Sequence, residues 1–175
     1  MKLVFPNLFY KEKAIQFINE FYEYDSEING SGGLGRYLKN SSYEEWLHKI
    51  YAEIDIANIP ETRVPALTYF YIRESDDAIV GMINIRLALN EPVKKESSHI
   101  GYCIRPTERR KHYATNMLRD SLKVLDKLGI KEVILTCDTS NVASANVIKN
   151  CSGVLLEEFY SNTYEAEIQK YVIRR

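Results

Sequence analysis

At the centre of this 175-residue chain stands the sequence HIGYCIRPTERRKHYAT, residues 99–115. Residues 99–105 are typical of a strand, and the arginines and lysine that follow lead into a long amphipathic segment. Cations at the N-terminus of a helix oppose its dipole, whereas a bound anion is stabilised there by the dipole and by free backbone N–H groups. The pattern indicates either a phosphate site or a charged turn in solvent.

The segments on both sides of this centre predict helices, then strands, then a strand-helix-strand unit. Apolar residues at three- and four-residue spacing predict helices over 11–24, 42–54, 109–128 and 142–149. Aromatic and β-branched runs predict strands over 67–73, 78–87, 99–105, 132–138, 154–160 and 169–173. Four glycines within residues 30–35 predict a loop, and residues 90–98 a polar connection. This order describes a mixed α/β sheet with a crossover helix.

Composition narrows the class of protein. With 45% hydrophobic and 27% charged residues, the chain can form a single globular core, and disorder is excluded. The net charge of −1 gives no general attraction for nucleic acid, and no basic stripe extends beyond residues 105–111. No stretch is long and apolar enough for a signal peptide or a membrane span. We expect no nucleic-acid partner and no membrane association.

The cysteines also favour one cellular compartment. Cys103, Cys137 and Cys151 are odd in number, widely spaced and form no CxxC pair. This pattern indicates neither a disulfide framework nor a zinc site. A reducing compartment follows as the expectation, and we predict a cytoplasmic location.

Two short motifs resemble those of a known family. The run RRKHYA, residues 109–114, resembles the Q/R-x-x-G-x-G/A signature of the GNAT superfamily of N-acyltransferases, with Arg109 first and Ala114 last. The run NVASAN, residues 141–146, is similar to the downstream N-x-x-S/A-x-x motif of the superfamily. This core resemblance covers about residues 69–153, and patterns at 32–35, 64–66, 83–86 and 99–102 resemble a bacterial subgroup of predicted acetyltransferases.

The resemblance implies an α/β fold with a central, mostly antiparallel sheet, a splayed cofactor-binding strand and flanking helices. We expect one domain over residues 1–175. Its helical part at 1–66 would lie on the substrate side, residues 67–153 would form the acetyl-CoA-binding core, and residues 154–175 would form closing strands.

The resemblance further implies acetyl-CoA as cosubstrate and no metal. The strand at 99–105 would face the pantetheine arm, and residues 109–115 would surround the pyrophosphate. The implied contact residues are Cys103, Ile104, Arg105, Arg109, Arg110, Lys111, His112, Tyr113, Ala114, Thr115, Asn141, Ser144 and Asn146. His112 departs from the family pattern because it stands where the motif has its first glycine. A β-carbon there would hinder the approach of the backbone to the phosphates, although the imidazole could itself donate a hydrogen bond.

The activity implied is transfer of the acetyl group to a primary amine by direct attack. The acceptor would be a small molecule or a peptide amine, and small members of the superfamily often form homodimers. Since residues 147–150 lack the tyrosine that commonly serves as the acid, a non-catalytic CoA-binding module is the alternative.

Three side chains are candidates for proton transfer. His99 begins the central strand and has the pKa range of a general base, or it is a strand-end histidine held by a hydrogen bond. Asp138 ends the next strand, as a functional carboxylate or as a turn residue. Tyr160, with Tyr164, could protonate the leaving thiolate. Cys103, four residues from His99 and so about 13 Å along the strand, is expected to be packed rather than nucleophilic.

Overall fold

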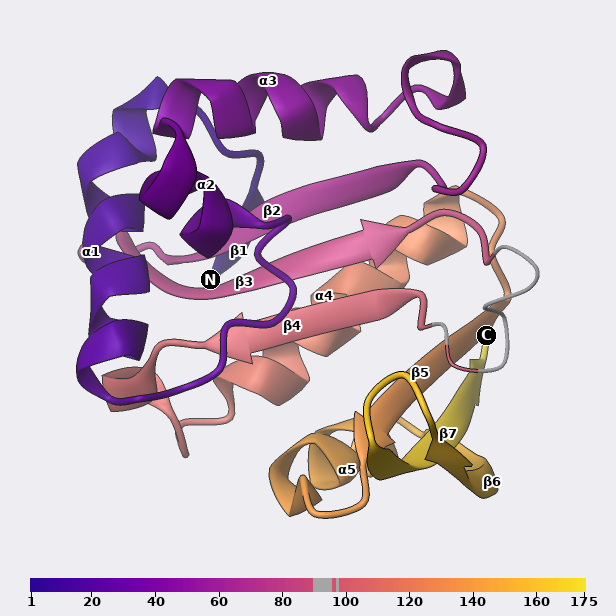
Figure 1. The fold of residues 1–175 in the computed structure, drawn as a ribbon. Coiled ribbons are helices and arrows are strands. Elements are labelled where there is room, and N and C mark those ends of the chain that lie inside the picture. Colours follow the sequence, from indigo (N-terminus) through magenta and orange to yellow (C-terminus); the bar gives the residue numbers. More distant parts are fainter. Residues whose placement is uncertain (90–95, 97) are drawn as a thin grey trace.

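The computed structural model describes residues 1–89, 96 and 98–175 and shows a mixed α/β fold built on two antiparallel sheets (Figure 1). The four-stranded sheet has the order β1-β2-β3-β4 and the three-stranded sheet the order β5-β7-β6. The strands are β1 (Lys2–Val4), β2 (Ala66–Arg73), β3 (Ala78–Arg86), β4 (Ile100–Ile104), β5 (Glu132–Asp138), β6 (Val154–Ser161) and β7 (Ala166–Arg174). The helices are α1 (Lys11–Glu23), α2 (Leu34–Asn40), α3 (Tyr43–Ala52), α4 (Tyr113–Lys127) and α5 (Val142–Lys149). Each described helix is too short or too polar to cross a bilayer.

The four-stranded sheet is buried on both faces. Helices α1, α2 and α3 cover one face, where Trp46 and Phe17 pack with Phe70 of β2. Helix α4 covers the other face, where Leu118 packs with Tyr71. Strand β2 therefore consists almost entirely of buried residues, as expected for a strand between two apolar layers. Each large side chain buried this way contributes about 1.5–3 kcal/mol.

Strands β4 and β5 meet at one end and separate toward the other (Figure 1). At the closed end, the His99 amide donates to the Ile134 carbonyl at 2.8 Å, and the Ile134 amide donates to Nδ1 of the His99 ring at 2.9 Å. Beyond this point β4 pairs only with β3, and β5 only with β7. The two sheets thus diverge like the arms of a V and leave the free edge of β4 facing the opening.

The predicted fold class is confirmed, with four differences. The single mixed sheet expected from the order of elements is divided into two antiparallel sheets, because β4 and β5 separate beyond His99. Strand β1 was not predicted, because three residues are too few to show a pattern. Helix α2 was not predicted, and its first two residues fall within the loop predicted over 30–35, because the helix begins directly after Gly33, whose φ is 85°. The helix predicted from residue 109 begins at Tyr113, because Arg110 and His112 take left-handed φ values of 62° and 58°. Most of the polar connection predicted over 90–98 lies outside the described residues.

Candidate active site

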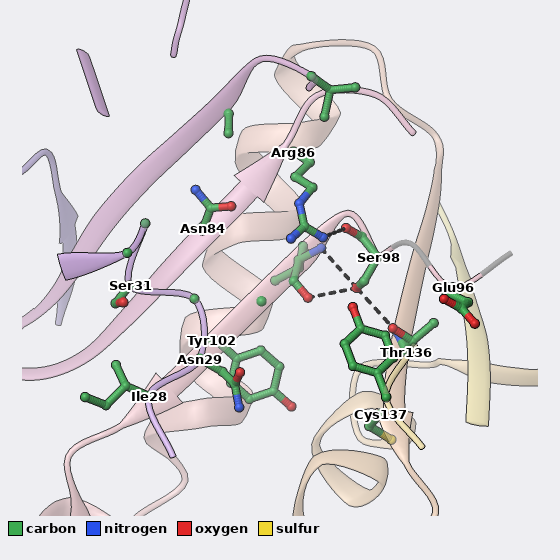
Figure 2. Close-up of a pocket in the computed structure, with 18 of the residues that line it drawn as sticks. Ile28, Asn29, Ser31, Asn84, Arg86, Glu96, Ser98, Tyr102, Thr136 and Cys137 are labelled. Atoms are coloured by element: carbon green, nitrogen blue, oxygen red, sulfur yellow. Dashed lines mark hydrogen bonds between the residues drawn. The ribbon is translucent and has the colours of Figure 1, made fainter. Parts of the chain in front are cut away.

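A cleft of about 820 Å³ fills the opening between the two sheets. Figure 2 shows side chains from both sheets and from the α1–α2 connection pointing into it. Its walls include Asn29, Gly30 and Ser31 of that connection, Lys49 and Glu53 at α3, Asn84 and Arg86 of β3, Gly101 and Tyr102 of β4, Cys137 and Asp138 of β5, and Asn141 and Ser144 at α5.

The backbone of β4 turns one amide toward the cleft. Bonds from the Arg86 amide to the His99 carbonyl (2.7 Å) and from the Arg105 amide to the Val80 carbonyl (2.9 Å) bracket the β3–β4 pair. In an antiparallel pair only every second residue faces its neighbour in this way. Residues 99 and 105 face β3, so every second residue between them faces β3 as well. Tyr102 lies between two such positions and therefore directs its N–H away from β3, toward the open side.

The glycine-rich segment between α1 and α2 touches β4 at the same place. Gly30 has a φ of +66°, and its Cα lies so close to the strand that an added β-carbon would stand 2.1 Å from the Gly101 carbonyl oxygen. The same β-carbon would stand 2.4 Å from the Tyr102 amide nitrogen. Only glycine fits here, so this segment forms a wall of the cleft over the Gly101–Tyr102 peptide bond.

Tyr102 also carries a hydroxyl that connects β4 with α5, on the opposite side of the cleft. Its phenol oxygen lies 2.9 Å from the Ser144 hydroxyl of α5, and the Cys137 thiol of β5 lines the same cleft. Burial raises the pKa of Tyr102 and keeps the phenol protonated. Sequence reasoning missed this residue because a tyrosine inside an apolar strand has the pattern of a core residue.

The turn before α4 is held in place by α1. Glu20 accepts hydrogen bonds from Arg105 Nε at 2.5 Å and from the Thr107 amide at 2.9 Å. Partial burial acts to raise the pKa of Glu20, but the bonds from Thr107 and Arg105 outweigh it and lower that pKa. Arg109 likewise turns back, with Nη2 2.6 Å from the Ser26 hydroxyl. These bonds show that both arginine side chains hold the turn in place, and their contact with a bound phosphate stays a prediction.

The turn before α4 exposes backbone amides at the N-terminus of this helix. Arg110 and His112 both have left-handed φ values, and His112 is the N-cap of α4 without a side-chain cap bond. Successive amides in such a conformation form an anion-binding concavity at a helix N-terminus. His112 thus adopts a left-handed backbone conformation, the kind that favours glycine.

We expect His112→Gly to raise the free energy of unfolding by about 1 kcal/mol, because it relieves a non-glycine residue in the left-handed region. Acetyl-CoA affinity should be retained or increased, since a β-carbon is removed from the concavity. Urea unfolding and calorimetric titration measure the two effects. His112→Ala is the matched control, because it keeps the strain and loses only the imidazole. If His112→Gly lowered affinity as much as His112→Ala, the imidazole rather than the backbone would bind the cofactor.

His99 lies at the closed end of the V, buried and outside the cleft wall. Its Nδ1 accepts the Ile134 amide, so the neutral ring carries its proton on Nε2 and has no lone pair left for an incoming amine. Burial also lowers the pKa of His99. This geometry favours the second of the two interpretations of His99, a histidine that joins the sheets.

The lowered pKa of His99 predicts acid sensitivity. Between that value and about 6.5, the pKa of histidine in an unfolded chain, only the unfolded state takes up the proton. The stabilisation is therefore complete above about pH 6.5 and is lost as pH falls through the folded-state pKa. We expect wild type to lose more stability than His99→Asn, which keeps an acceptor but does not titrate, when urea unfolding is compared at about pH 7.5 and pH 5.5. Equal losses in the two proteins would disprove this account.

The other predicted residues are divided between cleft, core and surface. Asp138 lines the cleft, and a hydrogen bond from Ser140 lowers its pKa. Asn141 caps α5 through the Ser144 amide at 3.0 Å, while Asn146 lies exposed on that helix. Tyr160 is 55% exposed on β6 and does not line the cleft, whereas Tyr164 does.

The remaining predicted contacts cluster around the turn and β4. Burial raises the pKa of Cys103 to about 12, which agrees with its expected packing role. Ile104 and Thr115 are buried, Tyr113 and Ala114 are partly buried, and Lys111 pairs with Glu108 at 2.9 Å. Among the described residues, no group of three or more His, Cys, Asp or Glu side chains could hold a metal ion.

Solved structures with the same fold are acetyltransferases. The microcin C7 self-immunity acetyltransferase MccE, solved with acetyl-CoA and AMP, has 18% identity and a TM-score of 0.69, covering 99% of this chain and 91% of that one. RimL, the ribosomal L7/L12 α-N-protein acetyltransferase solved with coenzyme A, has 15% identity and a TM-score of 0.70, with 98% and 92% covered. A spermidine N-acetyltransferase SpeG mutant from Vibrio cholerae has 13% identity and a TM-score of 0.64, with 99% and 95% covered.

The fold and the splayed strands therefore define an acetyltransferase architecture. A model of the acetyltransferase (GNAT) domain matches residues 19–153, and the chain belongs to this family. No curated protein sequence is significantly similar to it.

Proposed function

We propose that the protein transfers the acetyl group of acetyl-CoA to a primary amine by direct attack. The observation that carries the proposal is the free edge of β4 in the cleft, where one residue, Tyr102, offers both a backbone N–H and a phenol. The similar structures solved with acetyl-CoA or coenzyme A support the choice of cosubstrate.

The cosubstrate would enter from the open end of the V. The amides of residues 110–114, at the N-terminus of α4, would bind the pyrophosphate. The pantetheine arm would lie along the free edge of β4, opposite Cys137, Asn141 and Ser144. The residues predicted to contact the cosubstrate thus stay the same, but they would do so mainly through their backbone. The side chains of Arg105 and Arg109 would support the turn.

Tyr102 would then stabilise and complete the reaction. As the amine nitrogen bonds to the thioester carbon, the carbonyl oxygen gains negative charge, and the Tyr102 amide is placed to donate to it. When the C–S bond breaks, the Tyr102 phenol would give its proton to the thiolate, and the attacking nitrogen would lose its extra proton to solvent. The Tyr102 oxygen would then take up a proton from solvent through the Ser144 hydroxyl. Tyr102 thereby takes the role predicted for Tyr160.

The amine must lose its proton before attack, since a primary amine has a pKa near 10. Asp138 lies in the cleft but is a weak base because its pKa is lowered. We propose that the amine is deprotonated by solvent, so that kcat/KM rises with pH toward the pKa of the amine. A kcat/KM profile that already levels off below about pH 6.5 in wild type, but not in His99→Asn, would instead support His99 as base.

Release of free thiol from acetyl-CoA in the presence of amines, with mass spectrometry of the product, tests the proposal. The amines should span amino acids, peptides with a free N-terminus, polyamines and aminoglycosides. Acetylated amine formed in step with thiol supports transfer to nitrogen. Tight acetyl-CoA binding with no thiol release for any amine would support the non-catalytic module instead.

We also propose a cellular location for the protein and an oligomeric state. The three cysteines are all free, which supports a reducing, cytoplasmic location. A homodimer stays a prediction from the family resemblance.

A further inference from the structure

The part of the cleft on the β3 side of β4 is rich in cations. We call it the acceptor arm and define it by Asn84 and Arg86 of β3, Lys49 and Glu53 at α3, and Arg63. It holds three cationic side chains and one carboxylate. Along the described lining of the cleft, four cationic and four acidic side chains balance, so the cations are concentrated in the acceptor arm without being in excess over the cleft.

The one carboxylate of the acceptor arm is already neutralised twice. Glu53 pairs with Lys49 at 2.7 Å and with Arg63 at 2.8 Å, and its side chain is only 13% exposed. Lys49 also donates to the Gly32 carbonyl at 2.8 Å, which fixes its ammonium group. A cationic ligand would therefore find no available carboxylate among these residues.

The acidic side chains elsewhere in the cleft lie on other elements. Glu96 accepts a hydrogen bond from the Ser161 hydroxyl at 2.8 Å, on the side of the three-stranded sheet. Asp138 ends β5 and accepts the Ser140 amide at 2.6 Å. Glu27 belongs to the α1–α2 connection, where it contacts Asn29, and the cation Arg36 lies nearby in sequence on α2.

Arg86 differs from the other cations of the acceptor arm. Its Nη1 donates to the Ser98 backbone carbonyl at 2.7 Å, and within the described part of the chain it has no carboxylate partner (Figure 2). Among the described residues, this one bond to a fixed carbonyl orients the guanidinium and leaves Nε and Nη2 to bind a ligand. A guanidinium binds carboxylate or phosphate oxygens in pairs, which makes it suited to an anion.

The strand register sets the distance from Arg86 to the reacting atoms. Asn84 is directly opposite Gly101, the residue whose peptide bond with Tyr102 lies at the proposed acetyl position. Arg86 is two residues further along β3 on the same face, about 7 Å away at the usual rise of a strand. An acceptor that reacts near Gly101 and also contacts Arg86 must carry both groups within a few bonds.

We propose that the acceptor is a compact amine with an anionic oxygen group, carboxylate or phosphate, a few bonds from its nucleophilic nitrogen, and that Arg86 binds this group. This inference rests on the N-acetyltransferase function proposed above. It disfavours polyamines and aminoglycosides, because a second ammonium group would face the guanidinium.

Paired acceptors that differ chiefly in the anion test the proposal, with kcat/KM expressed per concentration of unprotonated amine. Glycine is compared with glycinamide, and O-phosphoethanolamine with ethanolamine, with spermidine as the polycation, by thiol release at saturating acetyl-CoA. We expect at least one anionic member to exceed its neutral partner about tenfold or more in kcat/KM. Which pair shows the difference identifies the anion as carboxylate or phosphate. Equal rates within both pairs, or a preference for spermidine, would overturn the proposal.

Substitution of Arg86 shows whether this residue causes the preference. Arg86→Gln should lower kcat/KM for the anionic acceptor about 10- to 100-fold, mainly through KM, and leave the neutral partner within about twofold. Arg174→Gln removes an exposed arginine of β7 that pairs with Glu132 and should change neither. An equal loss for both members of a pair would assign Arg86 a structural role and contradict the proposal.

Calorimetric titration of the protein with CoA and O-phosphoethanolamine or glycine separates this inference from the proposed function. Binding that is lost in Arg86→Gln, without acetyl transfer to any amine, would support the anion site and contradict the transferase function. Acetyl transfer to amines without any preference for the anion in binding or in rate would support the transferase function and contradict the anion site.

Discussion

Replacement of Gly30 by alanine is expected to reduce acetyl transfer at least about 100-fold and to destabilise the protein by about 1–3 kcal/mol. The new β-carbon would stand 2.1 Å from the Gly101 carbonyl oxygen, a backbone atom of β4 that cannot rotate away. The glycine segment must therefore move off the strand, and overpacking of this kind costs about 1–3 kcal/mol. A displacement of about 1 Å at a reacting centre is enough for a 100-fold loss of rate. Steady-state kinetics and urea unfolding measure both effects.

Gly33→Ala is the matched control for this prediction. Gly33 belongs to the same segment and has a φ of +85°, but an added β-carbon would meet nothing closer than the end of the Arg36 side chain at 3.5 Å. This substitution should cost only the left-handed strain of about 1 kcal/mol and should retain most of the activity. Similar losses of activity in Gly30→Ala and Gly33→Ala would show that the loop conformation matters and that its contact with β4 does not.

The second large effect is expected for Tyr102→Phe, which should lower kcat about 100-fold while acetyl-CoA affinity stays within about twofold. The ring and the backbone amide remain, and only the phenol that would protonate the thiolate is removed. The lost bond to Ser144 should cost about 1 kcal/mol of stability, too little to unfold the protein. Single-turnover thiol release and calorimetric titration separate the chemical step from binding.

Tyr71→Phe provides the control, because it removes a similar hydrogen bond from a buried tyrosine outside the cleft. The Tyr71 hydroxyl lies 2.9 Å from Asp120 Oδ2 and does not line the cleft. Its removal should affect stability and leave kcat unchanged.

Ser144→Ala should have an intermediate effect on kcat, since the phenol stays but loses its partner. Full activity in Tyr102→Phe would exclude the phenol as the acid.

The sequence predicted the parts of the fold that depend on local periodicity. The amphipathic segments that became α1, α3 and α4 and the runs that became β2 and β3 were found, because their core positions repeat at helical or strand spacing. The motif at 109–114 placed the turn before α4 correctly. His112, which stands where the family motif has a glycine, has a left-handed φ of the kind that favours glycine.

The site was harder to predict, because it depends on contacts between distant segments. The bond between His99 and Ile134 joins residues 35 positions apart, and only this bond shows the ring nitrogen to be occupied. Glu20 and Arg105 are 85 positions apart, so the bond between them could not be predicted. Tyr102 and Ser144 are separated by 42 positions, and neither position alone indicates a proton donor.

Calorimetric titration with acetyl-CoA, with free CoA and adenosine monophosphate as controls, tests most directly whether the cleft between β4 and β5 is an acetyl-CoA site. We expect micromolar binding of acetyl-CoA and CoA, and binding of adenosine monophosphate at least about tenfold weaker, because that nucleotide lacks the pyrophosphate and the pantetheine arm. Gly30→Ala should weaken the binding of acetyl-CoA more than that of CoA, since the segment contacts β4 at the proposed acetyl position. Absence of binding by acetyl-CoA and CoA alike would contradict the proposed function.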